Sequence, residues 1–216
     1  MTKRNRVLFV LIMTLFSCNL FWRNLGKKKP VEAYFSDPRD TAPLRRVVVL
    51  PFSIEGRSDA DPMLVWSIFC KELQKTARFE VLPLPEEDRD EWLDNIARLR
   101  GIFPISKLLD FCDKYKADAV IFGTVTRFRA YKPPCLGLRI GMVSAQTGQV
   151  VWETDAVYDM SEEDSLLDLK NYISSVTAPI DSLHSWELTL LSPRRFVSYV
   201  CYRIVEKWKT VDASFR

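Results

Sequence analysis

One short segment of the chain carries the residue types of a hydrolytic site. His184 is the single histidine, and Asp181, Ser182 and Ser185 lie around it. A serine activated by a histidine that a carboxylate orients can act as the nucleophile in acyl transfer. These neighbours would need a further group brought in by the fold, and the chain contains no G-x-S-x-G sequence, which marks one class of such nucleophiles. We therefore interpret His184 as a surface loop histidine and predict that the protein is not an enzyme.

Five cysteines offer metal-binding or redox chemistry. No two are spaced as C-x-x-C, and a single histidine is too few for the common zinc sites, so we expect no metal and no other cofactor. Four of the cysteines lie in the predicted globular part, and the apolar surroundings of three of them favour buried thiols. Disulfide pairing stays open, because four cysteines allow three complete pairings. The four are Cys70, Cys112, Cys135 and Cys201.

Acidic runs and glycines indicate no further catalytic chemistry. Carboxylates crowd residues 86–91 and 162–164, where consecutive acids at a helix start complement the helix dipole and remain solvated. The seven glycines are dispersed and form neither a G-x-G-x-x-G nor a Walker pattern, which excludes the usual phosphate-binding loops.

The N-terminus has the pattern of an export signal. A basic head, residues 1–6, precedes an apolar run over residues 7–16, which is shorter than the about 20 residues that span a bilayer. Lys3, Arg4 and Arg6 are three of the 31 basic side chains, and residues 1–17 hold none of the 28 acidic ones. Without this segment the chain is charge-neutral, so we expect no nucleic-acid partner.

The residues around Cys18 resemble the lipobox of bacterial lipoproteins. Ser17, a small residue, precedes the cysteine, and the aliphatic Leu15 stands three residues before it. The resemblance implies a signal peptide over residues 1–17, cleavage before Cys18, and acylation of its sulfur and new amino group. Asn19, rather than Asp, follows the cysteine, which in the best-known sorting systems implies the outer membrane. Two alternatives stay open: an uncleaved signal anchor over residues 7–22, and an ordinary secretory signal.

The rest of the chain divides into a tether and a globular part. Residues 18–44 are expected to form the lipid anchor and tether, because residues 26–43 are polar, with prolines and no hydrophobic period. Residues 45–216 are expected to form one α/β domain. Its buried strands are the unbroken apolar run VVVLPF, from residue 47, and FEVLPL, from residue 79. Three alternating segments over residues 119–131, 136–145 and 150–158 predict an antiparallel β-meander.

Helices are expected to flank this mixed five-stranded sheet. Helical spacing of apolar residues indicates helices from Asp61 to about Thr76, over residues 86–100, from Pro104 onward and from Ser161 onward. Ser192 and Pro193 start a last amphipathic helix with a single apolar stripe that ends at Trp208.

The connection between the first two meander strands is the candidate partner-binding loop. It is a proline-stiffened hairpin tip with one aromatic residue and two cations, the kind of rigid exposed loop through which a scaffold contacts a partner. An ordinary two-proline turn is the alternative interpretation. Arginines and carboxylates on the polar face of the meander, including Arg139 and Asp155, are expected to pair across the strands. The candidate loop residues are Arg129, Tyr131, Lys132, Pro133 and Pro134.

The order of these elements resembles one group of bacterial envelope proteins. The segment ADAVIFGTV, from residue 117, and the hairpin TGQVVW, from residue 147, carry most of the likeness, which covers about residues 45–158. The group comprises the amino-terminal domain of the Tol-system propeller protein, the curli secretion lipoprotein, the lipoprotein activators of penicillin-binding proteins and the Pel exopolysaccharide lipoprotein. The resemblance implies a periplasm-facing lipoprotein that works by binding.

From these patterns we expect a lipid-anchored interaction or scaffold protein. It would support an envelope assembly, secretion or peptidoglycan-related machine, with the membrane, through Cys18, and another envelope protein as its partners. The alternative is an oligomeric subunit of an outer-membrane export complex of the curli or Pel kind, which would make the chain a homo-oligomer.

Overall fold

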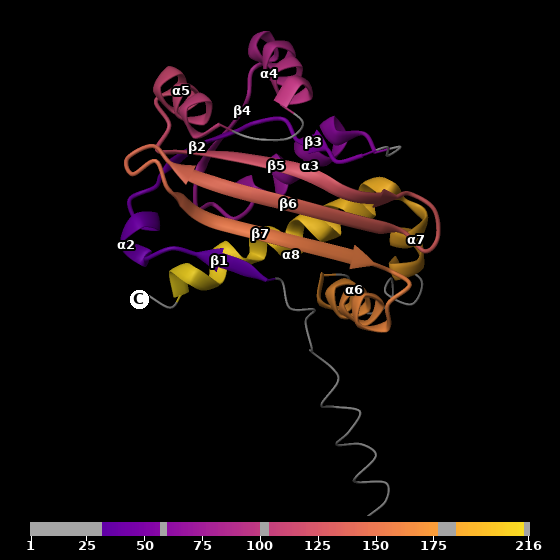
Figure 1. Ribbon diagram of the computed structural model, residues 1–216. Coiled ribbons are helices and arrows are strands. Elements are labelled where there is room, and N and C mark those ends of the chain that lie inside the picture. The colour runs from indigo at the N-terminus through magenta and orange to yellow at the C-terminus, as the bar shows by residue number, and fades with distance from the viewer. Residues whose placement is uncertain (1–31, 57–59, 100–103, 177–184, 214–216) are drawn as a thin grey trace, which may run out of the picture. The chain divides into compact units, whose positions relative to one another are not determined.

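The strands form one mixed sheet. The computed structural model describes residues 32–56, 60–99, 104–176 and 185–213 (Figure 1). The strand order is β1-β7-β6-β5-β2-β4, and β3 pairs with β5 outside this path. The strands span β1 Ala33–Phe35, β2 Arg46–Val49, β3 Ser53–Ile54, β4 Glu80–Pro83, β5 Ala119–Arg129, β6 Cys135–Ser144 and β7 Val150–Asp159.

Seven helices lie within the described residues. They are α2 Pro38–Thr41, α3 Pro62–Gln74, α4 Glu86–Leu99, α5 Ile105–Tyr115, α6 Glu163–Val176, α7 Ser185–Leu191 and α8 Pro193–Ala213. None of the described helices is long and apolar enough to cross a membrane.

The chain divides into two compact units. The described part of the first unit comprises residues 162–176 and 185–186, which contain α6 and the start of α7. Within it, α6 buries Leu169 and Ile173, and Lys170 Nζ lies 4.4 Å from the ring centroid of Trp186. The second, which we call the sheet unit, comprises residues 31–161 and 187–216 and holds all seven strands.

The parallel half of the sheet unit contains both predicted strands: β2 is buried, whereas β4 lies at the edge of the sheet and buries only Val81. β2 lies between β4 and β5 and is parallel to both. Val47, Val48 and Val49 are fully buried because α3 and α5 cover opposite faces of this half, as right-handed crossovers require. Asp61 caps α3 by accepting hydrogen bonds from the N–H groups of Met63 and Leu64, so the Asp-Pro start predicted from the sequence is confirmed.

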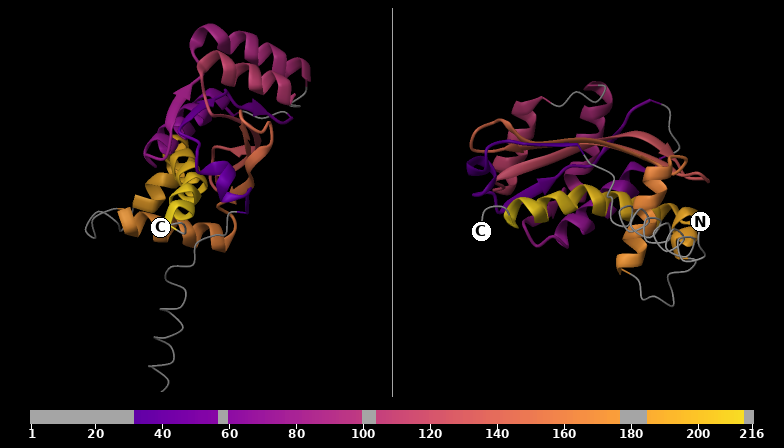
Figure 2. Two further views of the ribbon diagram at one scale, coloured as in Figure 1. Left: turned by 90° about the vertical axis from the view of Figure 1, so that its left-hand side faces the viewer. Right: turned by 90° about the horizontal axis from the view of Figure 1, so that it is seen from below.

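The antiparallel half is the predicted meander, β5-β6-β7, with one buried face. Leu136, Leu138 and Ile140 alternate along β6 and are fully buried. The α3 and α8 helices lie behind this half in Figure 1, and two further views show the same layering (Figure 2). Trp208 of α8 contacts Trp152 of β7, with ring centroids 5.5 Å apart, so the apolar stripe of the last helix covers the sheet as predicted.

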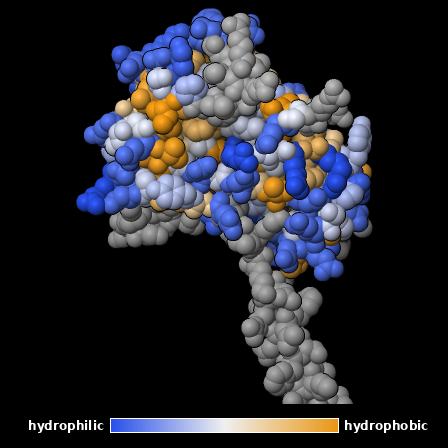
Figure 3. Space-filling model, viewed as in Figure 1, coloured by the Kyte–Doolittle hydropathy of each residue, from blue (hydrophilic) through white to orange (hydrophobic). Residues whose placement is uncertain are grey.

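The opposite face of the meander is exposed. Arg139 of β6 and Glu153 and Asp155 of β7 project from it, and hydrophilic residues lie across it in the space-filling view (Figure 3). Gly141 lies in the same row of the sheet as Phe122, and a Cβ atom at position 141 would lie only 2.6 Å from Phe122 Cζ. The glycine therefore makes room for the phenylalanine ring.

Two strands were not predicted, which makes the sheet seven-stranded rather than five-stranded. Strand β1, with α2 after it, lies within the residues expected to form the tether, and β3 follows β2 after a short connection. β1 is held by Phe35, whose ring centroid is 5.0 Å from that of Trp208 and 6.4 Å from that of Trp152. A single aromatic side chain in a three-residue strand leaves no periodic pattern in the sequence.

Candidate functional site

The hairpin tip, residues 129–135 between β5 and β6, contains all five candidate binding residues. Tyr131 is 86% exposed, the largest exposure among the large hydrophobic side chains of the described residues. Lys132 and Pro133 are also exposed, whereas Pro134 is buried and faces the protein rather than solvent. The peptide bond between Lys132 and Pro133 is cis. The tip therefore presents an aromatic ring and an ammonium group to solvent.

Arg129 fastens the tip from its first residue. Its Nε donates a hydrogen bond to the carbonyl oxygen of Pro133 at 2.5 Å, which closes the loop on itself. Its Nη2 donates to Asp159 Oδ1 at 2.8 Å, which ties the loop to the last residue of β7. The N–H of Met160 donates to the carbonyl oxygen of Pro134 at 2.9 Å. Three hydrogen bonds thus hold the backbone that carries Tyr131.

Asp159 is the centre of this arrangement. Its Oδ1 also accepts hydrogen bonds from the backbone N–H and the hydroxyl of Ser161, at 2.9 and 2.6 Å, and the Cys135 thiol is hydrogen-bonded to the same carboxylate. Partial burial alone would raise the pKa of Asp159, but the Ser161 hydrogen bonds and the charge of Arg129 hold that pKa below its ordinary value. Asp159 is therefore ionised at neutral pH and is available as the acceptor of the whole cluster.

Sequence reasoning missed Asp159, Met160 and Ser161 as parts of the site. The register of the meander brings them there, because Cys135 pairs with Arg129 on one side and with Asp159 on the other. The signal that could have found Asp159 is the expected pairing of cations and carboxylates across the strands, extended to the strand ends.

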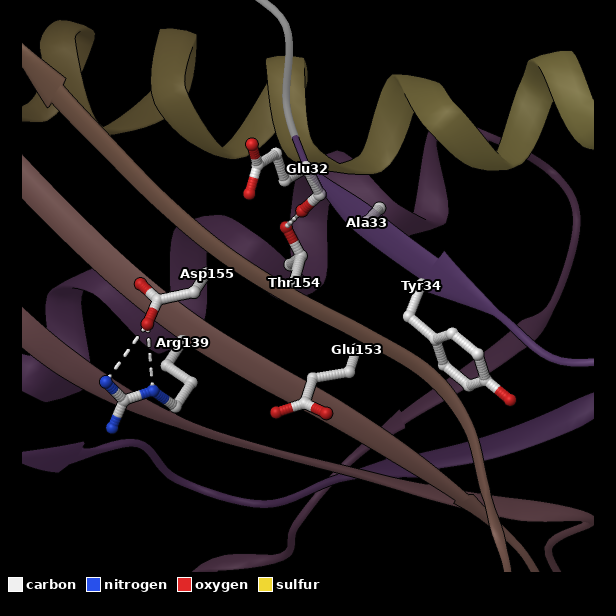
Figure 4. A pocket seen from close by; sticks show the side chains of 7 residues that line it. All are labelled: Glu32, Ala33, Tyr34, Arg139, Glu153, Thr154 and Asp155. Carbon is white, nitrogen blue, oxygen red and sulfur yellow. Dashed lines mark hydrogen bonds and ion pairs between the residues drawn. The ribbon is translucent and has the colours of Figure 1, made fainter.

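A pocket of about 550 Å³ lies on the exposed face, at the edge of the sheet formed by β1 (Figure 4). Four of its lining residues come from the β6 and β7 strands, and the chain around β1 completes it. Thr154 Oγ1 donates to the carbonyl oxygen of Glu32 at 2.8 Å and holds the start of β1 in place. The lining residues are Glu32, Ala33, Tyr34, Arg139, Glu153, Thr154 and Asp155.

The pocket carries more negative than positive charge. Arg139 is engaged with Asp155, with Nε and Nη2 both 3.0 Å from Oδ2, and its Nη1 lies 3.8 Å from Glu55. This confirms the predicted pairing of Arg139 across the strands. Glu153 lies between the Arg139–Asp155 pair and Tyr34, which is 59% exposed (Figure 4). Within the described residues, no side-chain hydrogen bond or ion pair engages the carboxylates of Glu153 and Glu32.

The four cysteines of the globular part are free and buried. Burial raises the pKa of the Cys70 and Cys112 thiols to about 12 and that of Cys201 well above its ordinary value. The described residues contain no group of three or more His, Cys, Asp or Glu side chains that could hold a metal ion. His184 and Cys18 lie outside the described residues.

No protein-family model and no curated protein matches the chain. The chain is similar to several solved structures. The PelC dodecamer from Paraburkholderia phytofirmans is 14% identical over 77% of this chain and 96% of PelC, with a TM-score of 0.42. The LpoB C-terminal domain from Escherichia coli is 12% identical over 53% of this chain and 82% of that chain, with a TM-score of 0.39.

A third similar structure is the hypothetical protein CT253 from Chlamydia trachomatis. It is 11% identical over 78% of this chain and 99% of that chain, with a TM-score of 0.42. PelC and LpoB belong to the lipoprotein group that the sequence resembles. At these identities the likeness concerns the fold alone.

Proposed function

We propose that this chain is a lipid-anchored, periplasm-facing protein of the bacterial envelope that works by binding a partner rather than by catalysis. The lipobox-like sequence at Cys18 supports export and anchoring. A protein attached through two or more acyl chains stays on the membrane, because each buried CH₂ contributes about 0.8 kcal/mol. The lipobox resemblance and Asn19 favour the outer membrane.

The observation that carries the binding role is the hairpin tip. Tyr131 is exposed on a loop whose backbone Arg129 and Asp159 hold in one conformation. A rigid, exposed tyrosine loses little conformational entropy on binding, which is why such residues often dominate the affinity of an interface. The tip has the properties of a preformed contact element for the partner of an envelope machine.

Two measurements test the proposal. Acyl-chain labelling and membrane fractionation of the full-length protein should show label and membrane residence that are both lost in Cys18→Ala. Unlabelled protein in the cytosol would refute the envelope location, and unlabelled protein that stays on the membrane would refute lipid anchoring.

The binding role is tested by photo-crosslinking in intact cells. A photoreactive phenylalanine analogue at position 131 should give defined crosslinked products. The same analogue at the exposed Gln146, in the turn between β6 and β7 at the other end of the strands, should not. Equal products from both positions, or none from position 131, would refute the tip as the contact element.

The second candidate function is an oligomeric subunit of an export complex. One specific observation favours it: the tip is basic and the pocket is acidic, so two copies of the chain carry complementary surfaces.

A further inference from the structure

We infer that the hairpin tip of one copy of this chain docks into the pocket of a second copy. This docking rests on the proposed function, because the hairpin tip is the contact element in both. Its partner here is a second copy of the chain. Tip and pocket belong to the same sheet unit, so every copy carries both halves of the contact.

The tip supplies cations beside an aromatic ring. Arg129 and Lys132 are exposed, and Asp159 is the carboxylate that Arg129 engages. Lys132 is adjacent to Tyr131 in the loop, and a lysine presents a mobile ammonium group on a flexible stem. The tip therefore offers an ammonium group and a phenol ring at neighbouring positions.

The pocket supplies the complementary groups. The carboxylates of Glu153 and Glu32 have no partner within the described residues, whereas Asp155 is already engaged by Arg139. Tyr34, which is 59% exposed, flanks Glu153 and gives the incoming ring an aromatic neighbour (Figure 4). An incoming lysine can pair with Glu153 while the tyrosine beside it contacts Tyr34.

A second copy must make the contact, because the tip of the same chain cannot reach its own pocket. The bonds from Arg129 to Pro133 and from Met160 to Pro134 hold the tip at the end of its strands, away from the exposed face. A contact between two different patches is heterologous, so it propagates from copy to copy until a ring closes or a filament forms.

Anchoring strengthens this contact. One loop in one pocket buries less surface than a stable interface needs, so we expect weak association in dilute solution. Chains confined to a membrane by their lipids meet at a much higher effective concentration, and each added copy brings another identical contact. The association should therefore be clear on vesicles and weaken with salt, because the paired charges are exposed.

The test is crosslinking of the full-length lipidated chain on phosphatidylcholine vesicles. The double variant Ala130→Cys/Ala33→Cys places one thiol in the tip and one in the pocket and keeps Tyr131, Lys132, Tyr34 and Glu153. Treated with a short bis-maleimide, it should give a ladder of dimers, trimers and larger products. Each single variant should remain monomeric, because like positions do not meet in a heterologous contact. Wild type controls for the native thiols, and Gln146→Cys/Ala33→Cys controls for collision.

Charge reversal gives a second, independent readout. Lys132→Glu and Glu153→Lys should each lower self-association on vesicles about tenfold or more, because each places like charges together. The combined variant Lys132→Glu/Glu153→Lys should restore it, since the pair is re-formed with its charges exchanged. Both substitutions are at exposed positions and should leave the folded state of all three variants intact, which circular dichroism checks.

The outcomes separate this inference from the proposed function. A ladder from the double cysteine variant together with rescue by the double charge reversal supports the docking of tip into pocket. Products from the single variants alone, or no rescue, overturn it. If position 131 then crosslinks a different envelope protein in cells, the docking of copies is wrong while the binding function stands.

Discussion

The guanidinium of Arg129 reaches across β6 to the carboxylate of Asp159, with Nη2 and Oδ1 2.8 Å apart. The two residues end β5 and β7, and Cys135, the first residue of β6, pairs with both of them. One row of the sheet thus joins three strand ends at the base of the loop that carries Tyr131. The conformation of the loop depends on this row.

Removing the negative charge of Asp159 should release the loop without unfolding the protein. Asp159→Asn removes the charge that Arg129, Ser161 and Cys135 share, so amide exchange of residues 130–132 should accelerate by at least about tenfold. The free energy of unfolding should fall by only about 1 kcal/mol or less, because the pair is partly exposed. Hydrogen exchange with mass spectrometry and urea denaturation measure the two effects. Unchanged exchange in the loop would refute the fastening role of Asp159.

The order of the loop should also depend on pH. A lowered carboxyl pKa means that the stabilisation is complete above the ordinary value of about 4 and is lost as the pH falls through the lower value of the folded state. Loop protection, corrected for intrinsic exchange rates, should therefore be constant from neutral pH to about pH 4 and should decrease below it. Asp159→Asn should show no such dependence. Circular dichroism over the same range checks that the fold persists.

Gly141 should not tolerate a side chain. Gly141→Ala places a methyl group 2.6 Å from Phe122 Cζ, so the ring must move, and we expect a loss of about 1–3 kcal/mol of stability. Phe122→Ala should remove much of the penalty of the added methyl group, which a double-mutant cycle in urea denaturation measures. If the two changes were simply additive, the close contact would not be the reason for glycine at this position.

The four thiols of the globular part should be unreactive in the native protein. Cys70, Cys112, Cys135 and Cys201 are buried and free, and burial raises their pKa values, so little thiolate is accessible to a maleimide at neutral pH. Mass spectrometry should find these four unlabelled before unfolding and all four labelled after unfolding without reductant. A pair that stays unlabelled in the unfolded chain would show a disulfide and contradict the structure.

Much of the fold follows from sequence patterns that are local. The run Val47 to Val49 predicts a strand buried on both faces, and the alternation along β6 predicts which face of that strand packs against the core. The Asp61 cap and the Ser192 start each mark a helix end through one polar side chain. These features depend on neighbours within a few residues, which is why the sequence alone predicts them.

The parts that the sequence did not predict depend on distant partners. β1 has only three residues, and it is stabilised by pairing with β7 and by the packing of Phe35 on Trp208. So short a strand shows no hydrophobic periodicity from which it could be predicted. The loop composition predicted Tyr131 and Lys132 as exposed candidates, but the burial of Pro134 and the role of Asp159 follow from strand register. Register is set by the whole meander, so local reasoning does not reach it.

The place of β1 in the sheet has a consequence for the order of folding. The hydrogen bond from Thr154 to Glu32 joins residues 122 positions apart in the sequence. Strand β1 therefore has no partner until β7 has been synthesised and has paired with β6. Bringing β1 to β7 closes a long loop and costs conformational entropy, and only the few contacts of β1 offset this cost. The first described residues of the chain are therefore among the last to fold, and the pocket that they complete forms only when the rest of the sheet is finished.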